Sequence, residues 1–276
     1  MGCLDEPGLK VFRETIHDEK WTLETVLSVH YWTPTLFSFC TTRHGDFRFT
    51  PGHYARLGLE SSSASLVWRP VSLVSAASDE VLEFLVVLIP GGEFSEALGR
   101  LKSGDAIRVE KLTFGFMTVD QLAAGRDLWL LASGTGLGPF VSILRNPATW
   151  SSFENLIVVH SVRRAAELTY REEISALARG HELMGEKTKL TYLPVVTREP
   201  GAAVLASRIP QLLADGVLER AAGMVLCVKS SRLMVCGNPK MAQGVRELLT
   251  GRGFSTSRRN APGQMAFENY WHGRGD

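Results

Sequence analysis

The segment LLASGTGLGPF, at residues 130–140, decides how the second half of the chain is interpreted. Its apolar start predicts the end of a buried strand, and Pro139 suits the first turn of a helix. Between them, Gly134, Gly136 and Gly138 let the backbone approach a bound group closely. The free N–H groups of such a helix start favour an anion, although the glycine spacing is not the GxGxxG pattern. A tight strand–helix turn without a ligand is the competing interpretation.

Strand and helix patterns alternate from this segment to the end of the chain. Further buried strands are predicted at 155–162, 190–197 and 231–237. Helical patterns follow the predicted strands at 134–146, 165–180, 208–219 and 238–253. This alternation predicts a doubly wound, parallel α/β sheet.

The first half of the chain has a different pattern of predicted elements. Between residues 20 and 118, short runs of β-formers are separated by turn sequences such as IPGG and KSGD. This pattern predicts an antiparallel barrel or sandwich, with one helix at 93–104. The segment QLAAGRD, at 121–127, marks the expected boundary between the halves.

Composition excludes several classes of protein. Lys and Arg total 30 against 29 Asp and Glu, so the net charge gives no reason to expect a nucleic-acid or membrane partner. The four cysteines form no CxxC, which argues against an iron–sulfur cluster or another metal site and favours a reducing compartment. No apolar run is long enough to span a membrane, and the start of the chain does not read as a signal peptide. We therefore expect a soluble, cytoplasmic protein.

Arginines follow the predicted strand ends or helix starts of the second half. They are Arg163, Arg164, Arg198 and Arg208. Ligands of open α/β sheets bind at the carboxyl ends of the strands. Arginines there suit a 2′-phosphate, and no acidic residue ends the second predicted strand of this half, so NADP is favoured over NAD. Ordinary surface arginines are the alternative.

Other residues of the chain give weaker indications of function. Arg69 and Ser72, in VWRPVS, could hold a flavin's phosphate and ring at a barrel rim. Cys236, in MVCGNPKM, would stand at the mouth of the sheet or be a buried structural cysteine. His160 is expected to be a packed core histidine, and the segment at 169–180 a solvated helix face.

Taken in order, these motifs resemble the bacterial type of ferredoxin (flavodoxin)–NADP+ reductases. The resemblance covers residues 20–271 and includes RPVS, IPGGEFSEAL, ASGTGLGPFVSIL, VVHSVRRAAEL, VCGNPKM and the terminal ENYW. It implies an N-terminal, antiparallel FAD-binding β-barrel domain at 18–122 and a C-terminal NADP-binding α/β domain at 123–271. Residues 272–276 form a tail that extends past the family's terminal aromatic residue.

The resemblance also implies site residues. The FAD residues would be Arg69, Val71, Ser72, Gly92, Phe94, Ser95, Thr135 and Trp271. The NADP residues would be Gly134, Thr135, Gly136, Arg163, Arg164, Arg198, Arg208, Cys236 and Gly237. The residues closest to the chemistry would be Ser72, Cys236, Glu268 and Trp271. Val71 departs from the family, which usually has a flavin-stacking tyrosine at that position.

The implied function is electron exchange between NADPH and ferredoxin or flavodoxin through FAD, by a monomer. A cluster of Arg246, Arg252, Arg258 and Arg259 could steer an acidic carrier to the protein. Two alternatives remain open at this point: a free-flavin reductase or oxygenase reductase component, and a non-enzymatic module that senses flavin or NADP.

Overall fold

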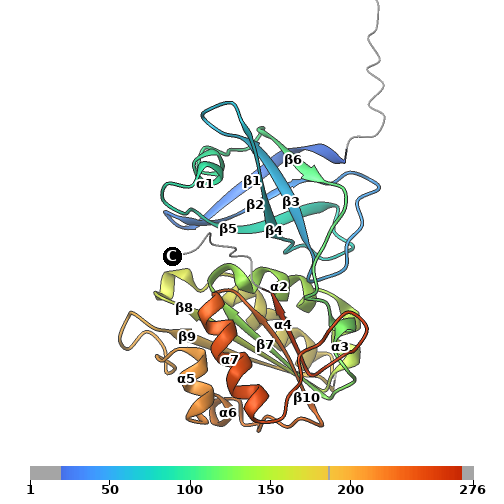
Figure 1. The fold of residues 1–276 in the computed structure, drawn as a ribbon, viewed down its shortest axis with the longest axis vertical. Coiled ribbons are helices and arrows are strands. Elements are labelled where there is room, and N and C mark those ends of the chain that lie inside the picture. The colour runs from blue at the N-terminus through green and yellow to red at the C-terminus, as the bar shows by residue number, and fades with distance from the viewer. Residues whose placement is uncertain (1–19, 186, 269–276) are drawn as a thin grey trace, which may run out of the picture.

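The computed structural model describes residues 20–185 and 187–268. Two sheets lie one above the other, with the N-terminal sheet on top in Figure 1. Among the described residues, no helix combines the length and apolar character needed to cross a membrane.

The N-terminal sheet is six-stranded, antiparallel and curled. Its strands are β1 (Trp21–Thr33), β2 (Leu36–Thr42), β3 (Tyr54–Glu60), β4 (Leu66–Ser72), β5 (Val81–Val87) and β6 (Ala106–Glu110). They are ordered β4-β3-β6-β1-β2-β5, and a bridge between Leu73 and Phe84 joins the two edges. The backbone N–H of Val74 donates to the Glu83 carbonyl at 2.9 Å beside this bridge. The predicted barrel architecture is confirmed.

Apolar side chains fill the inside of this barrel. Phe37 and Phe39 of β2 are almost fully buried, and Phe84 of β5 stacks on Phe39 with ring centroids 5.3 Å apart. Helix α1 (Glu93–Leu98) adds Phe94 and Leu98 to the same cluster. Alternate strand residues face this core, as expected for a sheet that is covered on one side.

The second sheet is five-stranded and parallel. It contains β7 (Asp127–Ser133), β8 (Asn155–Val162), β9 (Lys189–Val196), β10 (Ser231–Cys236) and β11 (Met265–Glu268), in the order β11-β10-β7-β8-β9. The central strands are apolar along their length because helices cover both faces. This confirms the doubly wound α/β fold.

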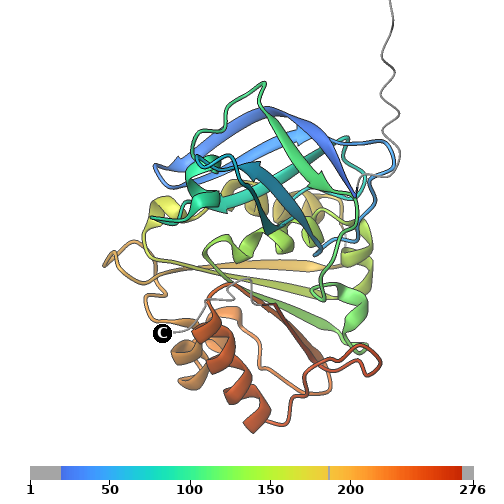
Figure 2. The same ribbon diagram turned by 45° about the horizontal axis from the view of Figure 1, so that its top comes forward.

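Helices cover the two faces of the parallel sheet (Figure 2). One face carries α2 (Gly138–Leu144), α3 (Pro147–Ser152) and α4 (Arg171–Leu183). The other carries α5 (Ile209–Ala214), α6 (Val217–Ala222) and α7 (Pro239–Gly251). Short 3-10 turns are η1 (Val119–Gln121), η2 (Gly134–Leu137) and η3 (Ala165–Glu167).

Several sequence expectations differ from the structure. The helix expected at 93–104 ends at Leu98, and the one expected at 165–180 becomes α-helical only at Arg171. The single helix expected at 208–219 is divided into α5 and α6, because Gly216 adopts a φ of 63° between them. The expected solvated face at 169–180 is also only partly solvated. Tyr170 is buried, and Glu173 contacts Arg145 beneath it.

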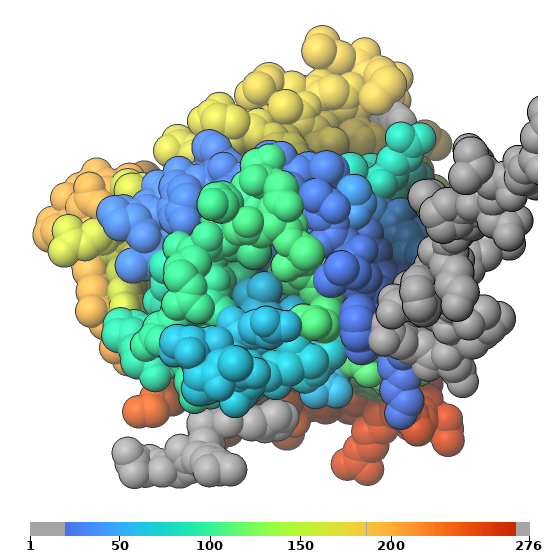
Figure 3. Space-filling view, turned by 90° about the horizontal axis from the view of Figure 1, so that it is seen from above, coloured from blue at the N-terminus to red at the C-terminus, as the bar shows by residue number. Residues whose placement is uncertain are grey.

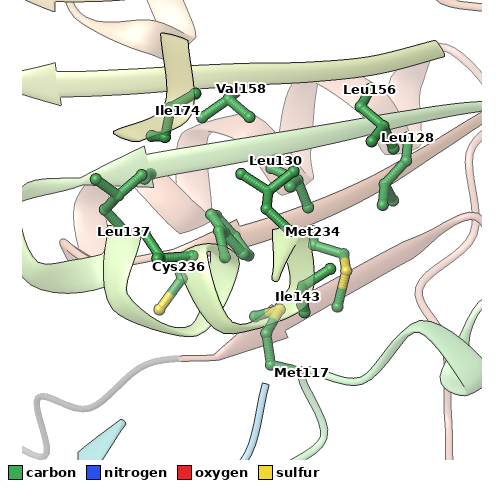
Figure 4. Close-up of a cluster of buried hydrophobic side chains, with 14 of the residues drawn as sticks. Met117, Leu128, Leu130, Leu137, Ile143, Leu156, Val158, Ile174, Met234 and Cys236 are labelled. Carbon is green, nitrogen blue, oxygen red and sulfur yellow. The ribbon is translucent and has the colours of Figure 1, made fainter. Parts of the chain in front are cut away.

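A continuous apolar cluster joins the barrel to the α/β half. Figure 4 shows Leu137, Ile143 and Met234 of the α/β half in this cluster with Met117, from the connection that leaves the barrel. Val74 and Leu85 of the barrel belong to the same cluster. The two halves are therefore packed against each other through an apolar interface.

Candidate functional site

The candidate site begins where the parallel sheet changes direction. The chain builds β8 and β9 on one side of β7, and then β10 and β11 on the other side. In doubly wound sheets this reversal opens a crevice at the carboxyl ends of the strands. The glycine loop after β7 and the Cys236–Gly237 turn after β10 both lie at this edge.

These two turns pack with almost no space between their backbones. A Cβ on Gly136 would lie 2.4 Å from the Cys236 carbonyl oxygen. Gly237 has a φ of 125°, and a Cβ there would lie 2.4 Å from the Ser133 carbonyl oxygen. The Asn238 N–H donates to Ser133 Oγ at 2.8 Å. The glycines are therefore required by the contact between the turns, in addition to any ligand.

A buried histidine supports the glycine loop from below. His160 Nε2 donates to the Gly134 carbonyl at 3.2 Å, and the Tyr192 hydroxyl lies 3.4 Å from Nδ1. Burial lowers the pKa of His160 to about 4, although the hydrogen bond to Gly134 acts in the other direction. The imidazole is therefore neutral near neutral pH. His160 is a core histidine, as predicted, and it also holds the loop.

Ser72 brings the barrel to this loop. A Cβ on Gly138 would lie 3.8 Å from the Ser72 Cβ and 3.4 Å from Val74 Cγ2. Ser72 is buried at the end of β4. Residues about 65 positions apart along the sequence are thus neighbours at the junction of the two halves.

Tyr54 and Glu268 extend the same junction. Tyr54 lies directly opposite Ser72 in the β3–β4 register, and its ring centroid is 6.1 Å from that of Phe114. Burial raises the pKa of the Tyr54 phenol, and the Glu268 carboxylate raises it further. Glu268 ends β11 beside Cys236, so it too reaches the crevice.

The flavin-stacking position has no aromatic side chain on its own strand face. Val71 packs partly against the barrel core and pairs with Ala55 in the sheet. Tyr54 pairs with Ser72 instead, so its ring occupies the opposite face of the same strands. Sequence reasoning did not identify Tyr54 or Phe114. Their proximity to Ser72 follows from the strand register, which the sequence alone does not give.

The expected diphosphate residues lie in β4 and at the start of α1. Arg69 is exposed, and its Nη1 donates to the Trp68 carbonyl at 2.8 Å, which leaves other N–H groups directed elsewhere. Ser95 Oγ accepts from the Ile89 N–H at 3.0 Å. Phe94 is a core residue, so only its backbone is available to a ligand.

The predicted arginines gather at one end of the crevice. The Arg198 N–H donates to the Arg163 carbonyl at 2.9 Å, which joins the ends of β9 and β8. Glu167 accepts from the backbone N–H groups of Arg163 and Arg164. Arg208 immediately precedes α5. The guanidinium groups of Arg163, Arg198 and Arg208 make no hydrogen bond or ion pair within the described part of the chain.

Other expected features lie elsewhere. Trp271 and the tail at 272–276 are outside the described residues. Arg252 pairs with Glu219 at 3.0 Å, and Arg246 lies over the Phe267 ring. Helix α7 runs back from the carboxyl edge of the sheet, so Arg252, Arg258 and Arg259 come at or after its far end. Arg252, Arg258 and Arg259 are therefore toward the edge opposite the glycine loop, apart from Arg246, so the four arginines do not form one cluster.

The donor set fits two dinucleotides. Exposed, unpaired guanidinium groups beside the crevice suit the phosphates of a nicotinamide dinucleotide. Arg69 and the turn before α1 offer N–H donors on the barrel, where a second diphosphate would lie. In the described residues, no group of three or more His, Cys, Asp or Glu could hold a metal ion.

The barrel, the doubly wound sheet and the crevice between them define a two-domain oxidoreductase that uses a flavin and a nicotinamide dinucleotide. Two family models agree: "Oxidoreductase FAD-binding domain" matches residues 31–112, and "Oxidoreductase NAD-binding domain" matches residues 130–247.

Relatives over the whole length identify the family. Ferredoxin–NADP reductase A of Sorangium cellulosum is 39% identical over 92% of this chain and 91% of its own. Flavodoxin/ferredoxin–NADP reductase of Escherichia coli is 36% identical over 91% of this chain and 99% of its own. The crystal structure of a ferredoxin NADP+ reductase from Neisseria gonorrhoeae, with bound FAD and NADP, superimposes with a TM-score of 0.85 at 32% identity, covering 92% and 100% of the two chains. The chain belongs to the ferredoxin–NADP reductase family.

Proposed function

We propose that this protein transfers electrons between NADPH and a small carrier, ferredoxin or flavodoxin, through FAD. The observation that carries the proposal is the contact of Ser72 of the barrel with Gly138 of the glycine loop. With FAD on the barrel and the nicotinamide in the crevice, this contact would bring the two rings next to each other, which supports the proposal. FAD, when bound, supplies two-electron exchange with NADPH and one-electron exchange with the carrier.

The residues of the chain would bind and orient the two rings. Arg69, Gly92, Ser95 and the Phe94 backbone would hold the flavin diphosphate. Ser72 would donate a hydrogen bond to the flavin ring edge. Val71 is too small to stack on the ring, so we propose Tyr54 as an aromatic contact from the Ser72 side.

The nicotinamide would lie over the carboxyl edge of β7 and β10. Thr135, between Gly134 and Gly136, is half-exposed in the loop and would face it. Cys236 and Gly237 would border the ring, and Glu268 would hold or release a proton nearby. Trp271 would cover the flavin face that the nicotinamide must reach.

Recognition of NADPH over NADH would depend on the exposed arginines. The 2′-phosphate needs donors that are not already neutralised by carboxylates. Arg163, Arg198 and Arg208 meet this condition in the described part of the chain, and Arg164 lies beside them. We also propose domain boundaries at 18–122 and 123–271, which the strand ends at Glu110 and Asp127 support.

An anaerobic titration of the purified protein with NADPH, and separately with NADH, tests the proposal. We expect the purified protein to contain a bound flavin whose absorbance is bleached by NADPH at a much lower concentration than by NADH. Flavin lost during purification would favour a free-flavin reductase. Bound flavin that NADPH does not reduce would favour a sensor. Rapid NADPH-dependent reduction of oxidised ferredoxin or flavodoxin, as the electron acceptor, completes the assignment.

A further inference from the structure

Arg145 lies at the end of the helix that begins in the glycine loop. Its Nε and Nη2 donate to the two carboxylate oxygens of Glu173 in α4, at 2.7 and 2.9 Å. Its Nη1 donates to the Val74 carbonyl at 3.1 Å and to Glu83 Oε2 at 2.7 Å, both in the barrel. One guanidinium therefore joins the two halves of the protein.

Glu83 is held from the α/β half by a second group. The Tyr170 hydroxyl donates to Glu83 Oε1 at 2.8 Å, so both oxygens of this carboxylate are occupied. Burial and then the Glu83 charge raise the pKa of Tyr170 well above its ordinary value, which keeps the phenol protonated. The side chains of Arg145 and Glu83 are only 20% and 16% exposed, so solvent screens this pair weakly.

Helix α2 contacts the barrel along its whole length. Gly138 meets Ser72 and Val74 at its start, and Ser142 Oγ donates to the Ser75 carbonyl at 2.7 Å in its middle. Arg145 completes the contact about 10 Å from Gly138 along the helix, at a rise of 1.5 Å per residue. Helix α2 thus connects the glycine loop directly to the Arg145 contacts.

A cavity of about 480 Å³ lies beside these contacts, between the N-terminal strands and α4. Figure 3 shows the yellow segment that includes α4 along one side of the blue strands. Ser28, His30, Trp32 and Cys40 line the cavity together with Arg145 and Tyr170, and the Trp32 ring packs on Tyr170 with centroids 5.2 Å apart. The Arg145 contacts therefore border open space on this flank and add to the apolar packing that joins the two halves.

We infer that Arg145 is a positioning residue: its bridge from Glu173 to Glu83 and Val74 fixes the glycine loop against the barrel, and so sets the distance between the nicotinamide and the flavin. The inference rests on the proposed function. Hydride transfer depends steeply on this distance, and a displacement of about 1 Å can slow a reaction about 100-fold. Loss of the bridge should slow the transfer without abolishing the binding of either nucleotide.

The test compares Arg145→Leu with Arg145→Lys and a matched control, Arg252→Leu. Arg252 also pairs with a carboxylate, Glu219 at 3.0 Å, and donates to a carbonyl, Leu213 at 2.7 Å, but entirely within the α/β half. Two measurements are made on the FAD-loaded full chain. The first is hydrogen exchange of residues 73–83 and 138–144 without nucleotide. The second is the single-turnover rate of flavin reduction at saturating NADPH, beside the Kd for NADP+.

For Arg145→Leu we expect faster exchange in both segments and a roughly 10- to 100-fold slower reduction, with the Kd for NADP+ changed less than about threefold. Arg145→Lys should recover part of the rate, because an ammonium can still reach Glu83. Arg252→Leu should leave exchange in these segments and the rate unchanged. If Arg145→Leu behaves like Arg252→Leu, the inference is overturned.

Two further outcomes separate the inference from the proposed function. A wild-type protein whose flavin NADPH does not reduce would overturn the function, and the exchange measurement would still decide whether Arg145 joins the halves. If Arg145→Leu does not fold, Glu83→Gln replaces it, because this variant removes the charge that Arg145 Nη1 contacts at 2.7 Å across the two halves. Unchanged exchange and rate in Glu83→Gln would then overturn the inference.

Discussion

At the scale of single residues, charge and protonation determine what the crevice can bind. The side chains of Arg163, Arg198 and Arg208 have no hydrogen-bond or ion-pair partner in the described residues, whereas Arg145, Arg232 and Arg252 are engaged by carboxylates or carbonyls. Sequence alone cannot separate these two groups, because both consist of arginines near strand or helix ends. Burial and hydrogen-bond partners separate them.

Replacing Arg198 by Ala should weaken the binding of NADPH selectively. A charge-assisted hydrogen bond contributes about 1.5–3 kcal/mol, so we expect KM for NADPH to rise roughly 10- to 100-fold. KM for NADH should stay within about twofold, since NADH has no 2′-phosphate. Steady-state rates with an artificial acceptor measure both values. Arg179→Ala, an exposed arginine on α4, is the control, and an equal loss with NADH would contradict the assignment.

His160 should make the protein less stable in acid. Its folded pKa of about 4 lies below the ordinary value of 6.5, so the unfolded chain takes up the proton first as the pH falls. The contribution is therefore complete above about pH 6.5 and is lost toward pH 4, by about 3 kcal/mol. Urea unfolding of His160→Gln at about pH 5 and about pH 7 should show a smaller pH dependence than wild type. Tyr192→Phe should keep the wild-type dependence, and equal dependence in all three proteins would exclude His160 as the cause.

At the scale of elements, the site is formed by the packing of turns. The loop after β7 and the turn after β10 touch through Gly136 and the Cys236 carbonyl. From the sequence, the glycine pattern predicts a ligand-binding site. The structure adds that one of these glycines accommodates another backbone.

Gly136→Ala should therefore destabilise the fold and distort the crevice. The added Cβ would lie 2.4 Å from a backbone oxygen, so the turns must separate, at a typical overpacking cost of about 1–3 kcal/mol. We expect a lower free energy of unfolding and weaker NADP+ binding, measured by urea titration and calorimetry. Gly180→Ala in α4 has no atom within 4 Å of the new Cβ and should instead stabilise by about 0.5–1 kcal/mol. A neutral Gly136→Ala would show that the turns can move apart freely.

At the scale of the whole molecule, an apolar cluster and the Arg145 contacts join the barrel to the α/β half. Relative motion of domains is the usual expectation unless their interface is large and apolar. Here Val74 and Leu85 of the barrel share a cluster with Phe140 and Ile143 of α2. We therefore expect the two halves to unfold together.

Leu85→Ala should destabilise both halves at once. Removing a buried leucine costs about 2–5 kcal/mol, and Leu85 is 5% exposed. Heating followed by far-UV circular dichroism and by flavin fluorescence should give coincident transitions, both shifted down. Leu23→Ala, at a side chain that is 60% exposed, should change the free energy of unfolding by no more than about 0.5 kcal/mol and leave both transitions in place. Separate transitions would show that the halves unfold independently.

Local sequence patterns are enough to predict the two sheet types, the glycine loop and the arginines that we propose for the 2′-phosphate. These features follow from local periodicity, turn residues and charge, which act between neighbours along the chain.

Contacts between residues that are far apart in the sequence are seen only in the folded protein. Ser72 lies against Gly138, Tyr54 lies opposite Ser72, and Arg145 reaches Glu83 across 62 positions of sequence. The segment at 169–180 is expected to be solvated from its charges alone, but Glu173 pairs with Arg145 and Tyr170 donates to Glu83 of the barrel. Such contacts depend on strand register and on the packing of two separately patterned halves, and neither is encoded in any short stretch of sequence.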